Sequence, residues 1–242
     1  MLAGVFAGLL ACGFAWLFGE PQVNLAIAFE QHMHQMAGEA PEPELVSRAV
    51  QSTAGLLTGI LVYGCALGGI FALVFAYAYG RIGGLSPRAT AALLATLGFV
   101  TLILVPQIKY PANPPAISNP ATIGLRTALY FTMLAISVIV AIAASSTGRQ
   151  LARHLDNWNG ALLGAATYVV AMIVAMLILP PVNEVPSSFP ATTLWSFRLA
   201  SLSAEAVLWI TLGLAFGMLA ERQLAASRRP DIRVSIDNPS YG

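Results

Sequence analysis

The chain has 242 residues, of which 57% are hydrophobic and only 10% are charged. Its mean hydropathy of +0.73 is far above what a water-exposed globular surface tolerates, which excludes a soluble protein. The net charge of +1, with basic residues scattered along the chain, provides no basic patch for nucleic acid. Cys12 and Cys65 lie in apolar runs and form no CxxC motif, so we assign them no metal or redox role. We therefore expect a protein of the lipid bilayer that binds no nucleic acid.

Long uncharged segments divide the sequence into expected membrane spans. A helix needs roughly 20 apolar residues to cross the hydrocarbon of a bilayer. Because a backbone in lipid must satisfy its own hydrogen bonds, and no segment shows the alternation of a barrel strand, we predict helices. The expected fold class is an all-α polytopic membrane bundle of about six transmembrane helices. In chain order the expected spans are residues 1–19, 54–80, 89–106, 126–147, 160–180 and 199–220.

The basic residues favour an orientation with both termini in the cytoplasm (N-in, C-in). Eight of the twelve Lys and Arg residues then lie inside, as the positive-inside rule favours. The inside residues are Arg81, Arg88, Arg149, Arg153, Arg222, Arg228, Arg229 and Arg233, and the outside residues are Arg48, Lys109, Arg126 and Arg198. We assign residues 1–226 to one integral membrane domain. The polar segment 227–242 has no apolar periodicity and is expected to be a disordered cytoplasmic tail.

Several expected spans contain two glycines four residues apart. This small-xxx-small spacing lets helix backbones approach closely, and we expect it to serve packing within the chain rather than dimerisation. The pairs are Gly4 and Gly8, Gly55 and Gly59, Gly64 and Gly68, Gly160 and Gly164, and Gly213 and Gly217.

The segment after the first span carries candidate metal ligands, Glu30, His32 and His34. On a helix, Glu30 and His34 are neighbours at i,i+4, whereas His32 and His34 point apart. Imidazole with carboxylate suits borderline divalent ions such as cobalt, nickel and zinc. The alternative is a surface histidine pair that binds no metal.

The outer ends of the third and fifth spans share the pattern Leu-x-Pro-x-x-charge-x-Pro, over residues 104–111 and 179–186. Each loop then resumes with Pro-Ala-Thr and reaches an arginine, Arg126 or Arg198. This predicts a parallel helical-hairpin repeat. Lys109 and Glu184 are then at equivalent depths and able to pair. The proline-rich loops are either a rigid external lid or the lining of a vestibule.

Glu205 interrupts the sixth span, about 10 Å of helix inward from Arg198. A carboxylate inside the membrane is costly and usually faces a cavity or a partner, unless it is hydrated near the interface or protonated. If the chain conducts a metal ion, as the resemblance given below implies, we expect Glu184 and Glu205 to form its anionic entry, with Lys109 and Arg198 gating it by pairing with the same carboxylates. Because the chain contains no HExxH, GxSxG or Walker motif, we do not expect an enzyme.

Several segments carry a resemblance to a known family. They are Lys109-Tyr110-Pro111-Ala112-Asn113-Pro114-Pro115, Asn183-Glu184-Val185-Pro186, Leu194-Trp195 and Phe197-Arg198. They closely resemble the signature of the CbtA family of cobalt transporter subunits, and the resemblance extends to about Leu224. It implies that the motif residues Lys109, Tyr110, Asn113, Asn183, Glu184, Trp195 and Arg198 have functional or structural roles.

The resemblance further implies a multi-pass protein of the bacterial inner membrane that takes up cobalt for cobalamin synthesis. It implies no cofactor apart from the transported cobalt ion, and a small one-helix partner subunit, CbtB, with a histidine-rich end. Two alternatives remain: a non-transporting membrane scaffold for a partner subunit, and a transporter of another divalent metal such as nickel.

Overall fold

The computed structural model describes residues 1–38, 46–117 and 122–227, and this part of the chain contains helices and no strand. Six of its helices are long and apolar enough to cross a membrane. The predicted all-α fold class is therefore confirmed, and the chain is a multi-pass membrane protein. The expected disordered tail lies outside the described residues from position 228 onward.

The first three long helices each contain a π-helical segment. The first comprises α1 (Leu2–Phe14), a π segment (Ala15–Gly19) and α2 (Glu20–Ala37). The second comprises α3 (Arg48–Val50), a π segment (Gln51–Gly55) and α4 (Leu56–Ala78). The third comprises α5 (Pro87–Gly98), a π segment (Phe99–Leu104) and α6 (Val105–Lys109). The segment that follows the first expected span is thus helical as far as Ala37.

The remaining long helices are α7 (Ile123–Ala152), α8 (Asn157–Ile178) and α9 (Ala191–Ser227), and a short 3-10 turn (Pro115–Ile117) lies in the loop before α7. Local sequence explains where two helices begin. Ser86 caps α5, where its hydroxyl accepts the Ala89 amide, and Pro87 follows at the first helical position. Asp156 caps α8 by accepting the Asn159 amide. Each expected span overlaps one of the six helices.

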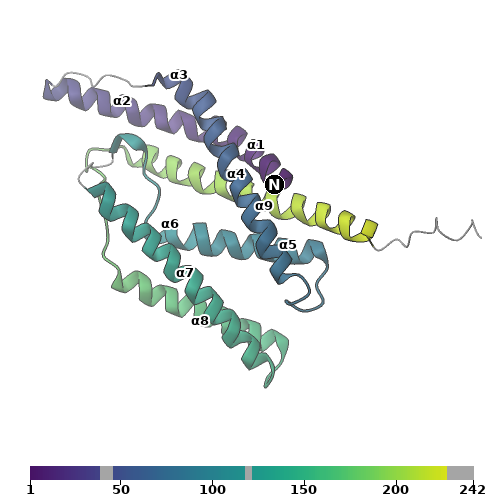
Figure 1. The fold of residues 1–242 in the computed structure, drawn as a ribbon. Coiled ribbons are helices and arrows are strands. Elements are labelled where there is room, and N and C mark those ends of the chain that lie inside the picture. The colour runs from purple at the N-terminus through teal and green to yellow at the C-terminus, as the bar shows by residue number, and fades with distance from the viewer. Residues whose placement is uncertain (39–45, 118–121, 228–242) are drawn as a thin grey trace, which may run out of the picture.

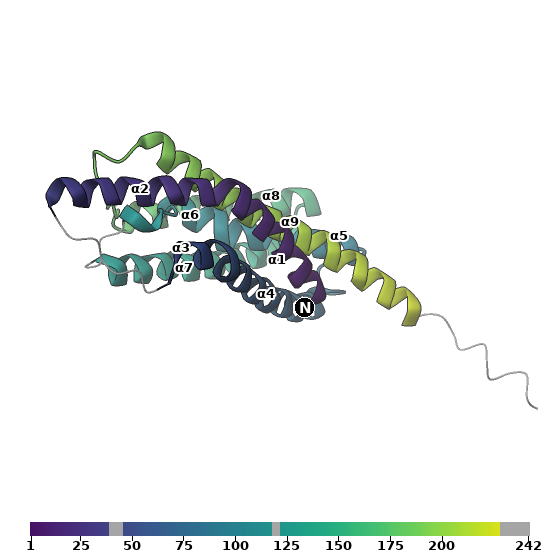
Figure 2. The same cartoon turned by 90° about the horizontal axis from the view of Figure 1, so that it is seen from above.

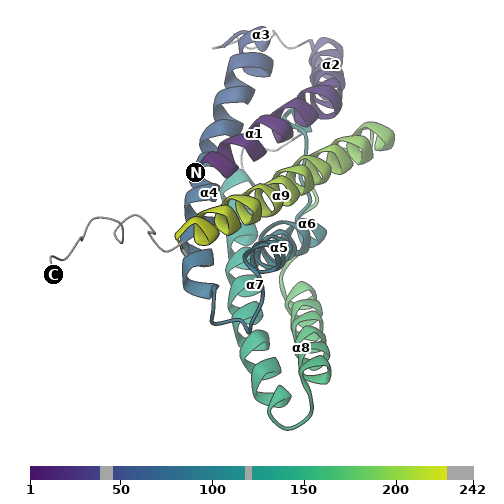
Figure 3. The ribbon, with the colours of Figure 1, turned by 90° about the vertical axis from the view of Figure 1, so that its right-hand side faces the viewer.

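The helices pack in pairs around α9. α9 contacts both α1 and α5, α1 also packs against α4, and α7 packs against α8. Figure 3 shows α9 and α5 between the α1/α4 pair and the α7/α8 pair. The α7/α8 pair joins the rest through the C-terminal part of the third helix, because α7 contacts the π segment 99–104 and α6. The first proline-rich loop connects α6 to α7, and the second connects α8 to α9. Their described parts lie at one end of the molecule together with α2 (Figures 1 and 2).

Glycines allow the closest helix contacts. A Cβ added to Gly64 of α4 would lie 2.6 Å from the carbonyl oxygen of Gly4 in α1, and one added to Gly160 would lie 2.7 Å from that of Gly148 in α7. A Cβ added to Gly213 of α9 would lie 2.6 Å from the Cβ of Ala95 in α5. Four of the five predicted glycine pairs therefore lie at helix interfaces: Gly4 and Gly8, Gly64 and Gly68, Gly160 and Gly164, and Gly213 and Gly217.

The prediction is wrong for Gly55 and Gly59. Gly59 has no neighbour within 4 Å, and Gly55 meets only the Val50 carbonyl of its own helix. Spacing alone does not reveal which face of a helix meets a neighbour, and this pair lies away from α1.

This difference gives a matched pair of variants on α4. Gly64→Ala places a methyl group against the α1 backbone, and we expect it to lower the free energy of unfolding by about 1 to 3 kcal/mol. Gly59→Ala meets open space and should leave stability unchanged or raise it by about 0.5 to 1 kcal/mol, because alanine favours the helix. Unfolding in detergent, followed by circular dichroism, measures both. Equal effects of the two variants would contradict the assigned α1/α4 interface.

Candidate functional site

Pro180 leaves one carbonyl at the end of α8 without a backbone donor. α8 ends at Ile178, and Pro180 has no N–H to donate to the carbonyl of Met176 four residues earlier. Lys109 Nζ donates to this Met176 oxygen at 2.7 Å. A cation at the negative end of a helix is also favourable. Lys109 therefore ties the end of the third helix to the end of the fifth.

Tyr110 makes a second connection between the same two segments. Its hydroxyl donates to the Pro180 carbonyl oxygen at 2.8 Å, and its side chain is only 6% exposed. Burial raises the pKa of the Tyr110 hydroxyl, which keeps it protonated as a donor. The two proline-rich motifs therefore meet, and the Lys109 and Tyr110 side chains join them.

Pro106 exposes a carbonyl in the third helix by the same mechanism. Residues 99–104 form a π-helix, in which each amide donates five residues back. Pro106 cannot donate to Thr101, and the Ser137 hydroxyl of α7 donates to this carbonyl at 2.7 Å instead. The Ser137 oxygen also lies 2.7 Å from the Tyr168 hydroxyl of α8. Sequence reasoning missed Ser137, because nothing in the sequence indicates the π-helical register.

Glu184 holds the second proline-rich loop against the start of α7. Its side chain is only 4% exposed, and it accepts from Arg126 Nη1 at 2.8 Å and from the Thr122 hydroxyl. A carboxylate at the N-terminus of a helix is also stabilised by the helix dipole. The predicted pairing of Glu184 with Lys109 is wrong, since Lys109 is bound to the Met176 carbonyl. The residue that pairs with Glu184 is Arg126, the arginine that follows the first Pro-Ala-Thr motif and that is not among the predicted site residues.

Arg198 of α9 holds the first proline-rich loop. Its Nε donates to the Ala112 carbonyl at 3.2 Å and its Nη2 to Asn113 Oδ1 at 2.8 Å. Both acceptors are neutral. In the described part of the chain, no carboxylate lies within 4 Å of the Arg198 guanidinium.

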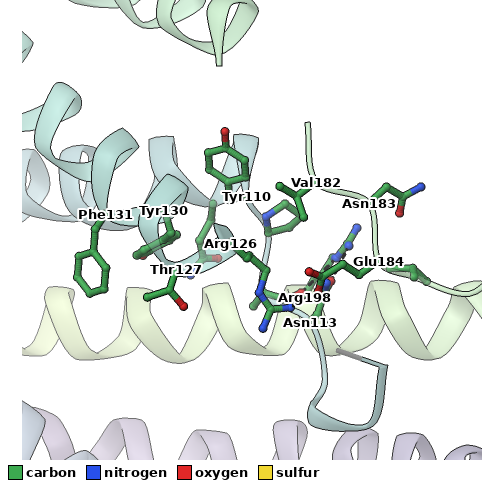
Figure 4. Close-up of a pocket in the computed structure, with 14 residues that line it drawn as sticks. Tyr110, Asn113, Arg126, Thr127, Tyr130, Phe131, Val182, Asn183, Glu184 and Arg198 are labelled. Carbon is green, nitrogen blue, oxygen red and sulfur yellow. Dashed lines mark hydrogen bonds and ion pairs between the residues drawn. The ribbon is translucent and has the colours of Figure 1, made fainter. Parts of the chain in front are cut away.

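These interactions surround a cavity of about 380 Å³ between the two loops and α7 and α9. Figure 4 shows the side chains that converge on it. The lining includes the predicted residues Tyr110, Asn113, Asn183, Glu184 and Arg198, together with Arg126, Thr127 and Tyr130. Lys109 and Trp195 do not line the cavity, and Trp195 is 69% exposed on α9.

Glu205 lies deeper in the bundle, seven residues or about 10 Å along α9 from Arg198. Its Oε2 is buried and has no hydrogen-bond partner among the described residues. The carboxylate interacts electrostatically with Tyr63 of α4 and Tyr130 of α7. Tyr130 also lines the cavity, whereas Glu205 does not. Glu184 and Glu205 therefore occupy separate sites.

The candidate ligands Glu30, His32 and His34 lie on α2 and do not line the cavity. His32 is exposed, and Glu30 and His34 are partly buried and one helical turn apart. No group of three His, Cys, Asp or Glu side chains that could hold a metal ion exists in residues 1–38, 46–117 and 122–227. These three residues thus provide at most a partial metal site within the described chain.

The fold and the site define a six-helix membrane protein with a charged cavity beneath two proline-rich loops. The family model described as "Probable cobalt transporter subunit (CbtA)" matches residues 1–221, and the chain belongs to this family. No curated protein and no solved structure matches the chain. The description as a subunit implies further components, and the description as a transporter agrees with a role other than catalysis.

The buried serine network can be tested by one deletion. Ser137→Ala leaves the Thr101 carbonyl without a donor, and we expect a loss of about 1 to 3 kcal/mol in the free energy of unfolding. Ser145→Ala is the control on the same helix, because the Ser145 hydroxyl is exposed and only donates to Ala141 one turn away. Unfolding in detergent compares them, and an equal loss in both variants would exclude the bridging role of Ser137.

Proposed function

We propose that the chain is the membrane subunit through which cobalt ions are taken up across the bacterial inner membrane, to supply cobalamin synthesis. It acts with a partner, for which a small one-helix subunit similar to CbtB is the candidate. Family membership and six membrane-spanning helices support this proposal. The observation that carries it is the buried carboxylate of Glu205, whose Oε2 has no partner in the described part of the chain.

An unpartnered carboxylate oxygen inside a membrane protein is costly unless a cation or a proton satisfies it. We propose that the transported ion is this partner of Glu205. Carboxylate oxygen is an acceptable ligand for a borderline divalent ion, although such ions usually also take imidazole. Because Glu205 belongs to no group of three or more His, Cys, Asp or Glu side chains in the described part of the chain, water molecules or the partner subunit complete the coordination in this proposal.

Glu184 has a different role in this proposal. Its carboxylate is already matched by Arg126, so an ion can bind Glu184 only by competing with that arginine. Opening of the Arg126–Glu184 pair releases the second loop from the start of α7 and admits cobalt, free or bound to a ligand, to the cavity. Arg126 thus takes the gating role that the sequence suggested for Lys109, while Lys109 remains attached to the end of α8.

Glu30, His32 and His34 are proposed to collect cobalt outside the membrane. Glu30 and His34 lie on one side of α2 and offer a carboxylate and an imidazole to cobalt. The site is incomplete without further ligands, as expected for transient capture.

The role of Glu205 is tested by Glu205→Gln, which keeps the size of the side chain but removes its negative charge. We expect cellular cobalt, measured by mass spectrometry at nanomolar external cobalt in an uptake-deficient bacterium, to fall by about tenfold or more. Glu221→Gln is the control on the same helix, because Glu221 forms an exposed ion pair with Arg88 and should leave uptake unchanged.

The same assay separates the alternatives. Unchanged uptake in Glu205→Gln would exclude a role in the path. No accumulation by the wild-type chain with its partner present in the membrane would favour a scaffold, and equal accumulation of nickel would indicate a broader divalent-metal transporter.

Glu184→Gln tests the gate. The amide still accepts a hydrogen bond from Thr122 but no longer neutralises Arg126, and we expect uptake to fall while membrane insertion persists. Glu20→Gln is the control, because Glu20 forms a similarly buried ion pair with Arg48 away from the cavity. Wild-type uptake by Glu184→Gln at limiting cobalt would remove Glu184 from the mechanism.

A further inference from the structure

The charge of the outer cavity is not what a bare divalent cation requires. Three charged side chains line it, Arg126, Arg198 and Glu184. Glu184 is paired with Arg126, so its negative charge is already matched within the protein. The charge of Arg198 remains without a carboxylate partner among the described residues, and the lining therefore has an excess of one positive charge.

Arg198 is also equipped to bind an anion. A guanidinium carries five N–H donors, and Arg198 uses its Nε and one Nη2 donor on the neutral oxygens of Ala112 and Asn113. Donors on a planar guanidinium favour carboxylate and phosphate oxygens. The contacts with Asn113 and Ala112 hold the Arg198 side chain at the cavity wall. Ligand binding therefore costs little additional side-chain entropy at Arg198.

The other lining groups are compatible with an oxygen-rich ligand. Thr127 and Asn183 add a hydroxyl and an amide, and Tyr130 forms part of the wall towards Glu205. A volume of about 380 Å³ falls within the usual range for small-molecule sites. A hydrated cation that approaches alone is repelled by Arg198, whereas a negatively charged complex of the same ion is attracted.

We propose that this cavity binds the carboxylates of an organic anion, and that cobalt reaches the protein as a carboxylate complex rather than as the bare ion. The second half of this statement rests on the proposed function. Arg198 holds the anion at the outer end of α9, and Glu205, about 10 Å further along the same helix, provides the carboxylate that competes for the metal.

The test uses the purified full-length chain in lipid nanodiscs and isothermal titration. The titrants are citrate, the 1:1 cobalt(II) citrate complex, cobalt(II) chloride and inorganic phosphate. We expect citrate and its cobalt complex to bind the wild type, and Arg198→Gln to weaken both by about tenfold or more. Arg198→Lys keeps the charge without the planar fork and should weaken binding by a smaller factor. Arg88→Gln, which removes an exposed arginine of another helix, should have no effect.

Absence of citrate binding to the wild type, or equal binding to wild type and Arg198→Gln, would overturn the anion site. Binding of phosphate but not of citrate would overturn the assignment to carboxylates. Binding of citrate alone, with no binding of its cobalt complex, would overturn the proposed form of the metal. If Arg198→Gln does not fold, Arg198→Lys replaces it in the test. A loss of citrate affinity in Arg198→Lys, together with competition between phosphate and citrate for the wild type, then supports the site. An unchanged citrate affinity in Arg198→Lys excludes the site.

These titrations require no transport, so their outcome is independent of the cobalt uptake assay. If Arg198-dependent binding of citrate is found but cells accumulate no cobalt, the proposed function fails while the anion site stands. If cells accumulate cobalt but citrate does not bind, only the anion site fails.

Discussion

The end of this protein that carries the proline-rich loops depends on carbonyl groups that proline leaves without donors. Inside a membrane protein, no bulk water replaces the missing backbone N–H, so each such carbonyl needs a side-chain donor. Lys109 supplies it for Met176, and Ser137 supplies it for Thr101. These two donors lie on different helices from their acceptors. The prolines therefore do more than end or bend helices: they create the sites at which the third, fourth and fifth helices are joined.

The same requirement explains why the charged motif residues do not all serve the cavity. Lys109 is committed to a helix end and Glu184 to the start of α7, which leaves Arg198 as the charged side chain of the lining that has no opposite charge within 4 Å in the described chain. The attachment of the two loops thus decides that the unmatched charge in the cavity is positive and that it lies at Arg198. Glu205 is not among the residues that line this cavity.

The sequence predicted the large-scale organisation because absence of charge and length are direct requirements of the bilayer. It also identified Tyr110, Asn113, Asn183, Glu184 and Arg198, which the fold brings to one cavity. The expected Lys109–Glu184 pair failed because the two copies of the proline motif differ in conformation: the first is helical to Lys109, whereas α8 ends at Ile178. Ser137 could not be found, because its acceptor depends on a π-helical register with no sequence signal.

The length of the first helix has a mechanical consequence. Its 36 residues extend about 54 Å, whereas the hydrocarbon of a bilayer is about 30 Å thick. In α2, Ala26 is fully buried against Ile117 of the first loop and Phe189 of the second, and Phe29 stacks edge-on against Phe189 at 5.0 Å. These contacts connect the first helix to both proline-rich loops, so a displacement of α2 moves both loops together.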